Sequence, residues 1–367
     1  MTAVRDEDLA RLLRALAVEA PSETSAVRLV REPDEPLAAW LSQLASARER
    51  ADERAVHHRS RVDAASRTLF GTTASDILGA QGIPLHRAAI SVAVPSGAQL
   101  ADLVPSLRGI APVGPTPPAP ASVEDVVRVS VTAHPDAVTG IVRLHGGAFW
   151  MGGGSVPSVI DRALVDHIAR HTRSAVFDVD YRLAPEHPYP AAIVDALTVL
   201  DAVRGGLAGI SVRSLALLGT SSGANTAALA ARADTLRTPS RLPLSALALI
   251  VPSMLLSDGP PALRDDPVAW ELRRTQLRGY LGDAVDPADP WVSPGAEESI
   301  SGLPPTFAAV AEYDDVAWGA AAFRDAVCVG GGDVDLRTYP MTHVTAAPRV
   351  EAAVVQDVAE YLRSHLA

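Results

Sequence analysis

The chain has 367 residues, of which 48% are hydrophobic and 20% charged, so it can bury a large core and is not a disordered chain. Its net charge of −11 argues against a partner such as nucleic acid or an anionic membrane surface. All 32 basic residues are arginine, which excludes chemistry that needs a lysine, such as a Schiff base or a Walker A phosphate site. The single cysteine, Cys328, excludes an internal disulfide and lies in an apolar stretch that predicts a buried thiol.

Residues 1–111 are predicted to form a helical N-terminal region. Apolar side chains recur there at helical spacing in two stripes, Leu9, Leu12, Leu13 and Leu16, then Leu37, Trp40, Leu41 and Leu44. The mixed-charge stretch from Arg48 to Arg61 indicates a solvated continuation of the second helix. The first 20 residues lack the apolar segment of a signal peptide, and no apolar run is long enough to span a membrane, so a cytoplasmic location is expected.

The sequence pattern changes after a proline-rich linker over residues 112–121. From 122 to 367, short apolar strands alternate with helices, which predicts an α/β domain with a mostly parallel sheet covered by helices on both faces. The alternation lapses between 253 and 302, where we expect a lid or cap insertion.

The run Gly219-Thr220-Ser221-Ser222-Gly223 follows a predicted strand and precedes a predicted helix. This context is typical of a nucleophile elbow, in which small residues permit a sharp turn that exposes the Ser221 hydroxyl. In this architecture an acid and then a histidine follow the serine along the chain. His343 is the candidate base, because the other downstream histidine, His365, lies near the C-terminus on an amphipathic helix.

The acid is expected directly after the strand predicted over 306–313. Asp314 is favoured because it comes first after this strand. Asp315 is the alternative, although it also suits the cap of the next helix.

A glycine-rich turn follows the strand predicted over 139–144. In His145-Gly146-Gly147-Ala148-Phe149 the glycines allow backbone N–H groups to approach a substrate carbonyl oxygen, on which negative charge develops. The N–H of Ser222 would be a further donor of such an oxyanion hole. The run Gly152-Gly153-Gly154 lacks the spacing and the lysine of a phosphate loop.

The motifs around Gly146 and Ser221, together with Asp180-Tyr181-Arg182-Leu183-Ala184-Pro185-Glu186-His187, resemble those of hormone-sensitive-lipase-like carboxylesterases of the α/β-hydrolase family. The resemblance runs from about residue 126 to the C-terminus. It implies hydrolysis of carboxylic esters by a triad of Ser221, Asp314 and His343. It also implies oxyanion donors at Gly146, Gly147, Ala148 and Ser222, and buried structural roles for Arg182, Glu186 and His187.

Several residues depart from the usual pattern of that family. Ala148 replaces the third glycine of the oxyanion motif, and Thr220 and Ser222 flank the serine where the family usually has Asp and Ala. Val344-Thr345 follows the histidine where Gly-Phe is usual. These changes leave the triad intact and suggest a divergent member with an unusual substrate.

The sequence therefore predicts a serine hydrolase that cleaves a small or medium ester through an acyl-enzyme, with no metal or organic cofactor. Two alternatives stay open: acyl transfer or ring closure by the same triad in a biosynthetic pathway, and a non-catalytic ligand-binding protein on a hydrolase scaffold. The N-terminal helices are expected to cap the site and set substrate size, because the site lies where parallel strands end. An edge strand or a cap helix could pair two subunits into a homodimer.

Overall fold

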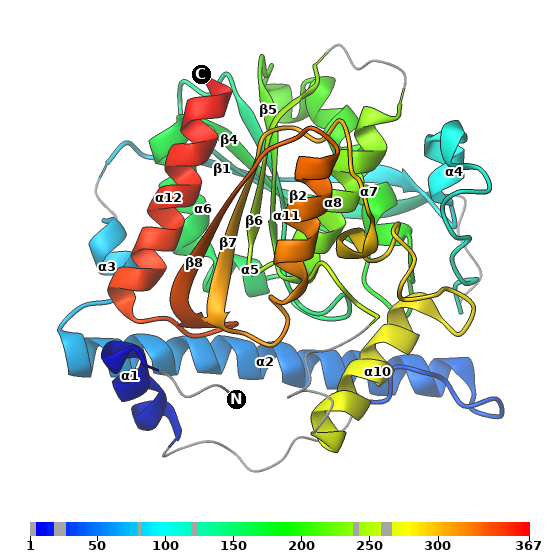
Figure 1. Ribbon diagram of the computed structural model, residues 1–367, viewed down its shortest axis with the longest axis horizontal. Helices are drawn as coiled ribbons and strands as arrows, with labels where there is room; N and C mark the ends of the chain where they lie inside the picture. Colours follow the sequence, from blue (N-terminus) through cyan, green and yellow to red (C-terminus); the bar gives the residue numbers. More distant parts are fainter. Residues whose placement is uncertain (1–4, 18–26, 80–81, 119–123, 238–241, 258–265) are drawn as a thin grey trace.

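A single mixed sheet forms the centre of the computed structural model, which describes residues 5–17, 27–79, 82–118, 124–237, 242–257 and 266–367. Its eight strands lie in the order β1-β2-β4-β3-β5-β6-β7-β8 (Figure 1). Strand β2 is antiparallel to both of its neighbours and every other pairing is parallel, which confirms the predicted mostly parallel sheet. The strands are β1 (His86–Pro95), β2 (Glu124–Ala133), β3 (Gly140–Leu144), β4 (Ala175–Asp180), β5 (Leu215–Thr220), β6 (Leu244–Ile250), β7 (Thr306–Tyr313) and β8 (Val334–Thr342).

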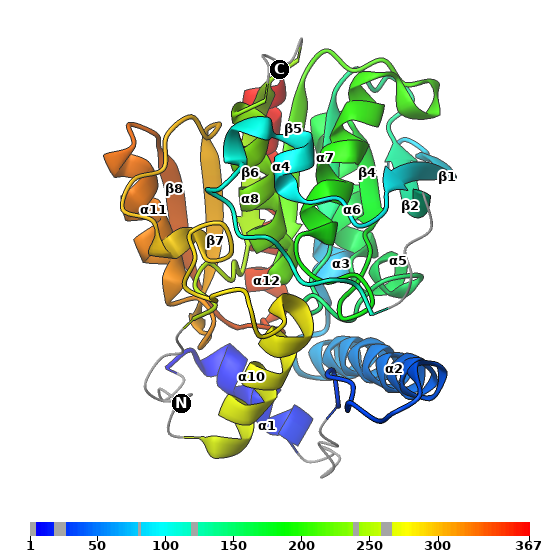
Figure 2. The same cartoon turned by 90° about the vertical axis from the view of Figure 1, so that its right-hand side faces the viewer.

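Helices cover both faces of this sheet, as predicted (Figures 1 and 2). Successive strand residues point to opposite faces, so Val142 packs in the core beneath α7, α8 and α11, whereas Ile141 packs in the core beneath α6 and α12. These helices are α6 (Arg162–Thr172), α7 (Ala191–Arg204), α8 (Ser222–Thr235), α11 (Gly319–Val329) and α12 (Pro348–Leu366). Shorter helices are α3 (Ala74–Leu78), α4 (Leu100–Leu103) and α5 (Val156–Ile160).

Strand β1 lies inside the N-terminal region that was predicted to be helical. It pairs with β2 along its whole length, from His86 opposite Ala133 to Pro95 opposite Glu124. The strand was missed because it is an edge strand whose first residues are exposed, so that only Val92 and Val94 are buried and the alternation is weak. The prediction that the Cys328 thiol is buried is also wrong, because Cys328 is exposed on α11.

Three helices lie across the carboxyl ends of the strands (Figures 1 and 2). The longest, α2 (Leu37–Phe70), runs along this edge of the sheet, with α1 (Glu7–Ala17) and α10 (Pro267–Leu281) beside it. Both predicted apolar stripes contribute buried residues: Leu12 and Leu16 of α1 pack on Val62, while Trp40 and Leu44 pack with Leu29 and Trp150. Helix α10 belongs to the segment 253–302, in which an insertion was expected.

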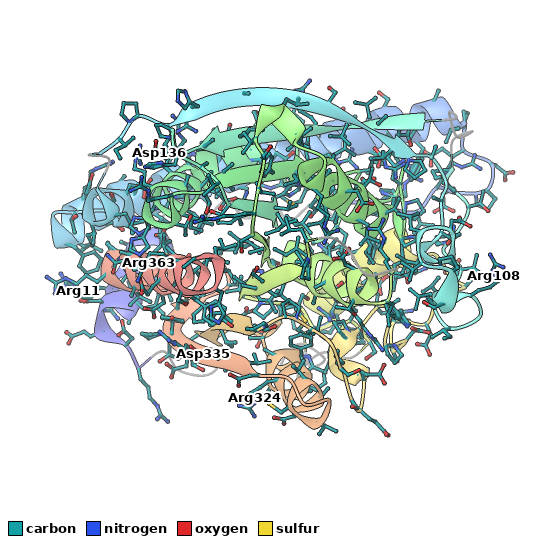
Figure 3. All side chains as sticks on the ribbon, turned by 90° about the horizontal axis from the view of Figure 1, so that it is seen from above. Arg11, Arg108, Asp136, Arg324, Asp335 and Arg363 are labelled. Carbon is teal, nitrogen blue, oxygen red and sulfur yellow. The ribbon has the colours of Figure 1, made fainter. Side chains whose placement is uncertain are left out.

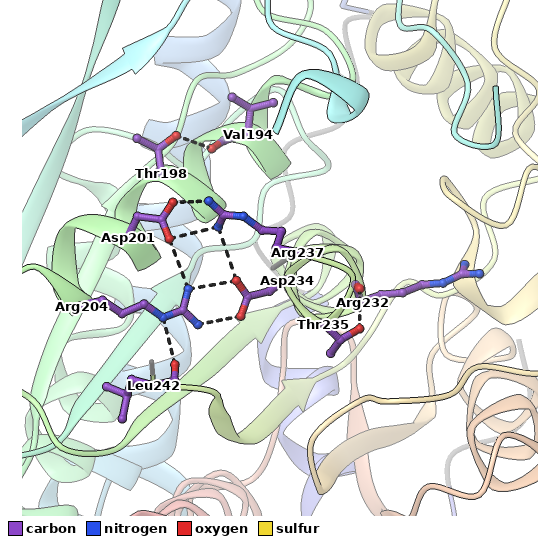
Figure 4. Close-up of polar contacts among 9 residues, drawn as sticks. All are labelled: Val194, Thr198, Asp201, Arg204, Arg232, Asp234, Thr235, Arg237 and Leu242. Carbon is purple, nitrogen blue, oxygen red and sulfur yellow. Dashed lines mark hydrogen bonds and ion pairs between the residues drawn. The ribbon is translucent and has the colours of Figure 1, made fainter. Parts of the chain in front are cut away.

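An arginine–aspartate network joins the ends of α7 and α8 (Figure 4). Arg204 donates to both carboxylate oxygens of Asp234, at 2.9 and 2.6 Å, and its Nε donates to the Leu242 carbonyl at 3.0 Å. Arg237 pairs with Asp201 on the outer side of the network. These contacts fix α7 to α8, the helix that follows Ser221, at the end remote from that serine.

Charged side chains such as Arg11, Arg108, Asp136, Arg324, Asp335 and Arg363 lie at the rim of the molecule (Figure 3). Arg182 is an exception, because its side chain is only 7% exposed and is paired with Asp195, which is fully buried. The guanidinium donates to Asp195 Oδ1 at 2.7 Å and to Asp125 at 2.7 Å, and the Arg182 backbone N–H donates to Asp195 at 2.8 Å. This ion pair ties the segment after β4 to α7 and β2.

Removal of the Asp195 carboxylate would leave the buried Arg182 charge with one carboxylate, that of Asp125, and the Pro95 carbonyl oxygen as partners. We expect Asp195→Ala to lower the free energy of unfolding by about 3–5 kcal/mol, which chemical denaturation would measure. Glu360→Ala is the control, because Glu360 pairs with Arg363 and His171 at the surface, where its side chain is 55% exposed, and the loss of stability should be much smaller than that in Asp195→Ala. Equal effects of the two substitutions would contradict this view of the Arg182 pair.

Candidate active site

Ser221 lies in a tight turn between β5 and α8, with φ 55° and ψ −119°. The turn brings backbone atoms so close that the flanking glycines have no room for a side chain. A Cβ on Gly219 would lie 2.4 Å from the Gly223 carbonyl oxygen, and a Cβ on Gly223 would lie 2.2 Å from the His145 carbonyl oxygen. The G-x-S-x-G pattern is therefore a steric requirement of this turn.

The structure brings Ser221, His343 and Asp314 together in one hydrogen-bonded chain. Ser221 Oγ lies 2.8 Å from His343 Nε2, and His343 Nδ1 lies 2.7 Å from Asp314 Oδ2. The Asp314 side chain is 2% exposed, whereas that of His343 is 28% exposed. The carboxylate is thus shielded from water, while the imidazole and the hydroxyl reach the surface of the site.

Asp315 and His365, the alternatives for the acid and the base, take no part in these hydrogen bonds. Asp315 is exposed, whereas the other carboxylate oxygen of Asp314 accepts from the Val316 N–H at 2.9 Å and so fixes the turn after β7. His365 lies in the last turn of α12, where its Nδ1 is 2.8 Å from the Tyr361 carbonyl oxygen.

The glycine loop, residues 145–154, follows β3 and borders Ser221. A Cβ on Gly146 would lie 3.2 Å from Ser221 Cβ, and a Cβ on Gly147, where φ is 134°, would lie 1.9 Å from the Met151 carbonyl oxygen. Among the described residues, the N–H groups of Gly146, Gly147, Ala148 and Ser222 donate no backbone hydrogen bond outside the regular elements. Of these residues, Gly146 lies against Ser221 and Ser222 follows it directly.

Ala148, which replaces the usual third glycine, packs its methyl group against the N-terminal region. Ala148 has φ 49°, and it packs against the cluster formed by Leu29, Trp40, Leu44, Ala51 and Trp150. Its methyl group therefore contributes to the contact between the glycine loop and the N-terminal helices.

His145 begins the glycine loop and is buried. Its ring stacks on Tyr181 with centroids 4.3 Å apart, and its Nδ1 lies 2.7 Å from the Gly146 carbonyl oxygen. The Tyr181 hydroxyl donates to the His145 carbonyl at 2.7 Å. Burial lowers the pKa of His145, so the neutral ring is the form that fits this position.

The implied structural residues of the third motif differ in burial. Arg182 is buried, whereas Glu186 and His187 are half-buried. Glu186 makes an ion pair with Arg48 of α2, at 2.6 Å.

Part of α2 that was interpreted as solvated contacts the site. The Gly152 N–H donates to Asp52 at 2.8 Å, and His58 Nε2 lies 3.1 Å from Thr345 Oγ1. The sequence places Arg48, Asp52 and Arg59 at helical spacing on the face that carries Leu44 and Ala51, but it does not show which groups these side chains contact.

Residues 141–346 match the model of a family described as the alpha/beta hydrolase fold. The match covers more than half of the chain, so this chain belongs to the α/β-hydrolase family, as its motifs predicted.

Curated relatives resemble the same part of the chain. An esterase of Acinetobacter venetianus is 34% identical over 200 residues, which are 53% of this chain and 63% of that protein. Esterase LipI of Mycobacterium tuberculosis is 34% identical over 205 residues, 53% of this chain and 62% of that protein. Carboxylesterase NlhH of the same organism is 31% identical over 213 residues, with corresponding shares of 55% and 65%. The chain thus spans less than two thirds of the length of each of these relatives.

Solved esterase structures share the fold. A Pyrobaculum calidifontis esterase superimposes with a TM-score of 0.64 at 21% identity, over 92% of this chain and 96% of that one. An arylesterase superimposes with a TM-score of 0.64 at 16% identity, over 99% of both chains. At these identities the similarity concerns the fold alone.

Within the described ranges, no helix is long and apolar enough to cross a membrane. The same ranges contain no group of three or more His, Cys, Asp or Glu side chains that could hold a metal ion.

The lowered pKa of His145 predicts how stability changes with pH. A histidine in the unfolded chain has a pKa of about 6.5. As the pH falls below this value, the unfolded chain binds a proton that buried His145 does not, so the free energy of unfolding decreases. Above it, both states are neutral at this position and the stability is fully retained.

We expect His145→Gln to reduce the loss of stability between about pH 7.5 and about pH 5.5, a range that spans the ordinary histidine pKa, measured by chemical denaturation. A part of the loss should remain, because burial also lowers the pKa of His58, His167 and His187. The exposed His57 provides the control His57→Gln, which should behave like the wild type. Identical pH dependence in wild type and His145→Gln would contradict this assignment.

Proposed function

We propose that the protein is a serine hydrolase that cleaves a small or medium carboxylic ester. The observation that carries this proposal is the series of hydrogen bonds from Ser221 through His343 to Asp314, set in an elbow turn beside the glycine loop. Membership of the α/β-hydrolase family and relatives described as esterase and carboxylesterase support it.

In the first half of the reaction Ser221 is the nucleophile. Its Oγ attacks the ester carbonyl carbon while His343 Nε2, 2.8 Å away, takes the hydroxyl proton. Asp314 holds the His343 Nδ1–H and stabilises the imidazolium that forms. His343 then donates the proton to the departing alcohol oxygen, and the acyl group stays on Ser221.

Negative charge on the carbonyl oxygen is stabilised by backbone donors. In this proposal the N–H groups of Gly146, Gly147, Ala148 and Ser222 surround that oxygen, because Gly146 lies against Ser221 and Ser222 follows it directly. In the second half, His343 takes a proton from water as the water oxygen attacks the acyl carbonyl carbon. His343 then returns this proton to Ser221 Oγ as the bond from Oγ to the acyl carbon breaks, and the carboxylic acid is released. The mechanism uses no metal or organic cofactor.

The substrate is bounded by the helices over the strand ends. In this proposal α1, α2 and α10 cap the site, since Leu29 before α2 lies against Gly279 of α10 and the cluster around Trp40 contacts the glycine loop. A capped site favours esters with a short or medium acyl chain.

Ser221→Ala tests the proposed nucleophile. We expect turnover of p-nitrophenyl esters to fall by about 10³-fold or more while the protein keeps its melting temperature, because the hydroxyl acts in chemistry and contributes little to packing. Ser299→Ala, at an exposed serine, is the control. Hydrolysis by Ser221→Ala at the wild-type rate would refute the proposal. Rapid acylation of Ser221 without release to water would instead indicate an acyltransferase.

Asp314→Asn and Asp315→Asn form a matched pair for the third member of the triad. An amide in place of the Asp314 carboxylate would favour the wrong tautomer of His343, so kcat should fall by about 10³- to 10⁴-fold. Asp315→Asn should leave kcat within about twofold, because the side chain is exposed to water. The reverse ranking of kcat would identify Asp315 as the acid.

A further inference from the structure

Helix α2 contacts the site through polar side chains, and it lies outside residues 141–346, which the family model covers. The match to the family model therefore assigns no role to these side chains. Two sets of contacts are involved, about 15 Å apart along the helix axis at about 1.5 Å per residue. One set reaches the glycine loop and the other reaches the residues that follow His343.

The first set centres on Arg48, whose side chain is only 20% exposed. Its Nε donates to the Trp150 carbonyl at 2.6 Å, and its Nη2 donates to the Ala184 carbonyl at 3.0 Å. Both terminal nitrogens also donate to the Glu186 carboxylate, at 2.8 and 2.6 Å. Because the Ala184 N–H donates to the Phe149 carbonyl at 2.9 Å, Arg48 joins two segments that are already bonded to each other.

Asp52 lies one helical turn after Arg48 and contacts the same loop. Its Oδ1 accepts from the Gly152 N–H at 2.8 Å. Gly152 in turn lies against Gly146, since a Cβ there would be 2.4 Å from the Gly146 carbonyl oxygen. Asp52 therefore holds Gly152, and Gly152 lies directly against Gly146, the loop residue beside Ser221.

The second set centres on His58, which is half-buried. Its Nε2 lies 3.1 Å from Thr345 Oγ1, and the backbone of Val344 lies beside the ring. Thr345 is buried, and its N–H donates to Thr342 Oγ1 at 3.0 Å, so these contacts close the loop that carries His343. Next to His58, Arg59 donates to Glu351 in the first turn of α12 at 2.5 Å.

We propose that α2 is a positioning element of the active site, in which Arg48 and Asp52 hold the oxyanion donors and His58 holds the loop that carries His343. This proposal rests on the serine-hydrolase mechanism proposed above. The physical basis is that one rigid helix, packed by Trp40, Leu44 and Ala51, contacts both loops that must be placed against Ser221. A displacement of either loop by about 1 Å costs up to about 100-fold in rate.

This role differs measurably from that of a wall that limits substrate size. A wall changes KM, and the change depends on the length of the acyl chain. A positioning element changes kcat by the same factor for every chain length, because the oxyanion donors and His343 act on the ester group that all substrates share.

The first test compares Arg48→Lys and Arg48→Ala in the full-length protein. Lysine keeps a positive charge beside Glu186 but lacks the planar fork that reaches the two carbonyl oxygens. We expect both variants to lower kcat about 10- to 100-fold on p-nitrophenyl acetate, butyrate and octanoate, with little change in KM. Arg50→Lys, at an exposed arginine of the same helix, is the control. Full kcat in Arg48→Lys would overturn the positioning role of Arg48.

The second test compares His58→Ala with His58→Gln. Glutamine retains an N–H donor and a carbonyl acceptor near Thr345 and Val344, so it should recover most of the kcat that alanine loses. The neighbouring exposed His57→Ala is the control. Equal kcat in His58→Ala and wild type, or a rise in KM that grows with acyl length, would show that α2 only lines the substrate site.

A substrate-independent measurement separates this proposal from the proposed function. A fluorophosphonate forms a bond from Ser221 Oγ to phosphorus as fluoride leaves, with His343 taking the serine proton, and intact mass reports the rate. We expect the same ranking of variants in this reaction. If the wild-type protein reacts with the fluorophosphonate but hydrolyses no ester, the proposed ester hydrolysis is wrong. The ranking of the variants in the fluorophosphonate reaction then still tests the positioning role of α2. Melting temperatures identify any variant that is unfolded, and Arg48→Lys and His58→Gln then decide the result.

Discussion

The backbone conformation of Ser221 is the constraint on which the site depends. Its φ of 55° and ψ of −119° fall in a region that costs a residue with a side chain about 1–3 kcal/mol. The surroundings stabilise this conformation: the Ser221 N–H donates to the Ile250 carbonyl at the end of β6, and the His145 carbonyl lies against Gly223. Because β5 lies between β3 and β6, the ends of both neighbouring strands meet at this turn. The turn that exposes the serine hydroxyl therefore also contacts the start of the glycine loop and the end of β6, and these contacts fix the positions of both.

The elements around this turn were predictable because their signals are local or follow from strand order. The elbow is written in five consecutive residues, and the acid and histidine follow the last two strands of the sheet, β7 and β8. Parallel strands end at one edge, so Asp314 and His343 had to lie near Ser221 once the strands were assigned. Even the choice between Asp314 and Asp315 had a local argument, since Asp314 comes first after the strand and Asp315 also suits the cap of the next helix.

The missed features lack such signals. Strand β1 begins with His86 and Arg87 and buries residues only near its end, so no alternating pattern marks it. The polar contacts of α2 were missed for another reason. A charged side chain on a helix gives the same sequence pattern whether it faces water or the carbonyl oxygens of a loop. The partners of Arg48 are the backbone carbonyls of Trp150 and Ala184 in addition to Glu186, and backbone groups leave no trace in residue identity.

The conformation of the glycine loop is stabilised by contacts from both the N-terminal helices and the hydrolase sheet. Ala148 and Phe149 both have positive φ values, of 49° and 69°, which are unfavourable for residues with side chains. Contacts from α2 help to offset this cost, through the Arg48 hydrogen bond to Trp150 and the apolar cluster around Trp40, and Phe149 also stacks on Tyr280 of α10 with ring centroids 3.9 Å apart. An α/β-hydrolase sheet alone would supply the β3 end of the loop and the Ala184 contact to Phe149, but not these. The loop conformation therefore depends on residues that precede the part of the chain matched by the family model, and changes in α2 should reach Ser221 without altering any residue that touches the substrate.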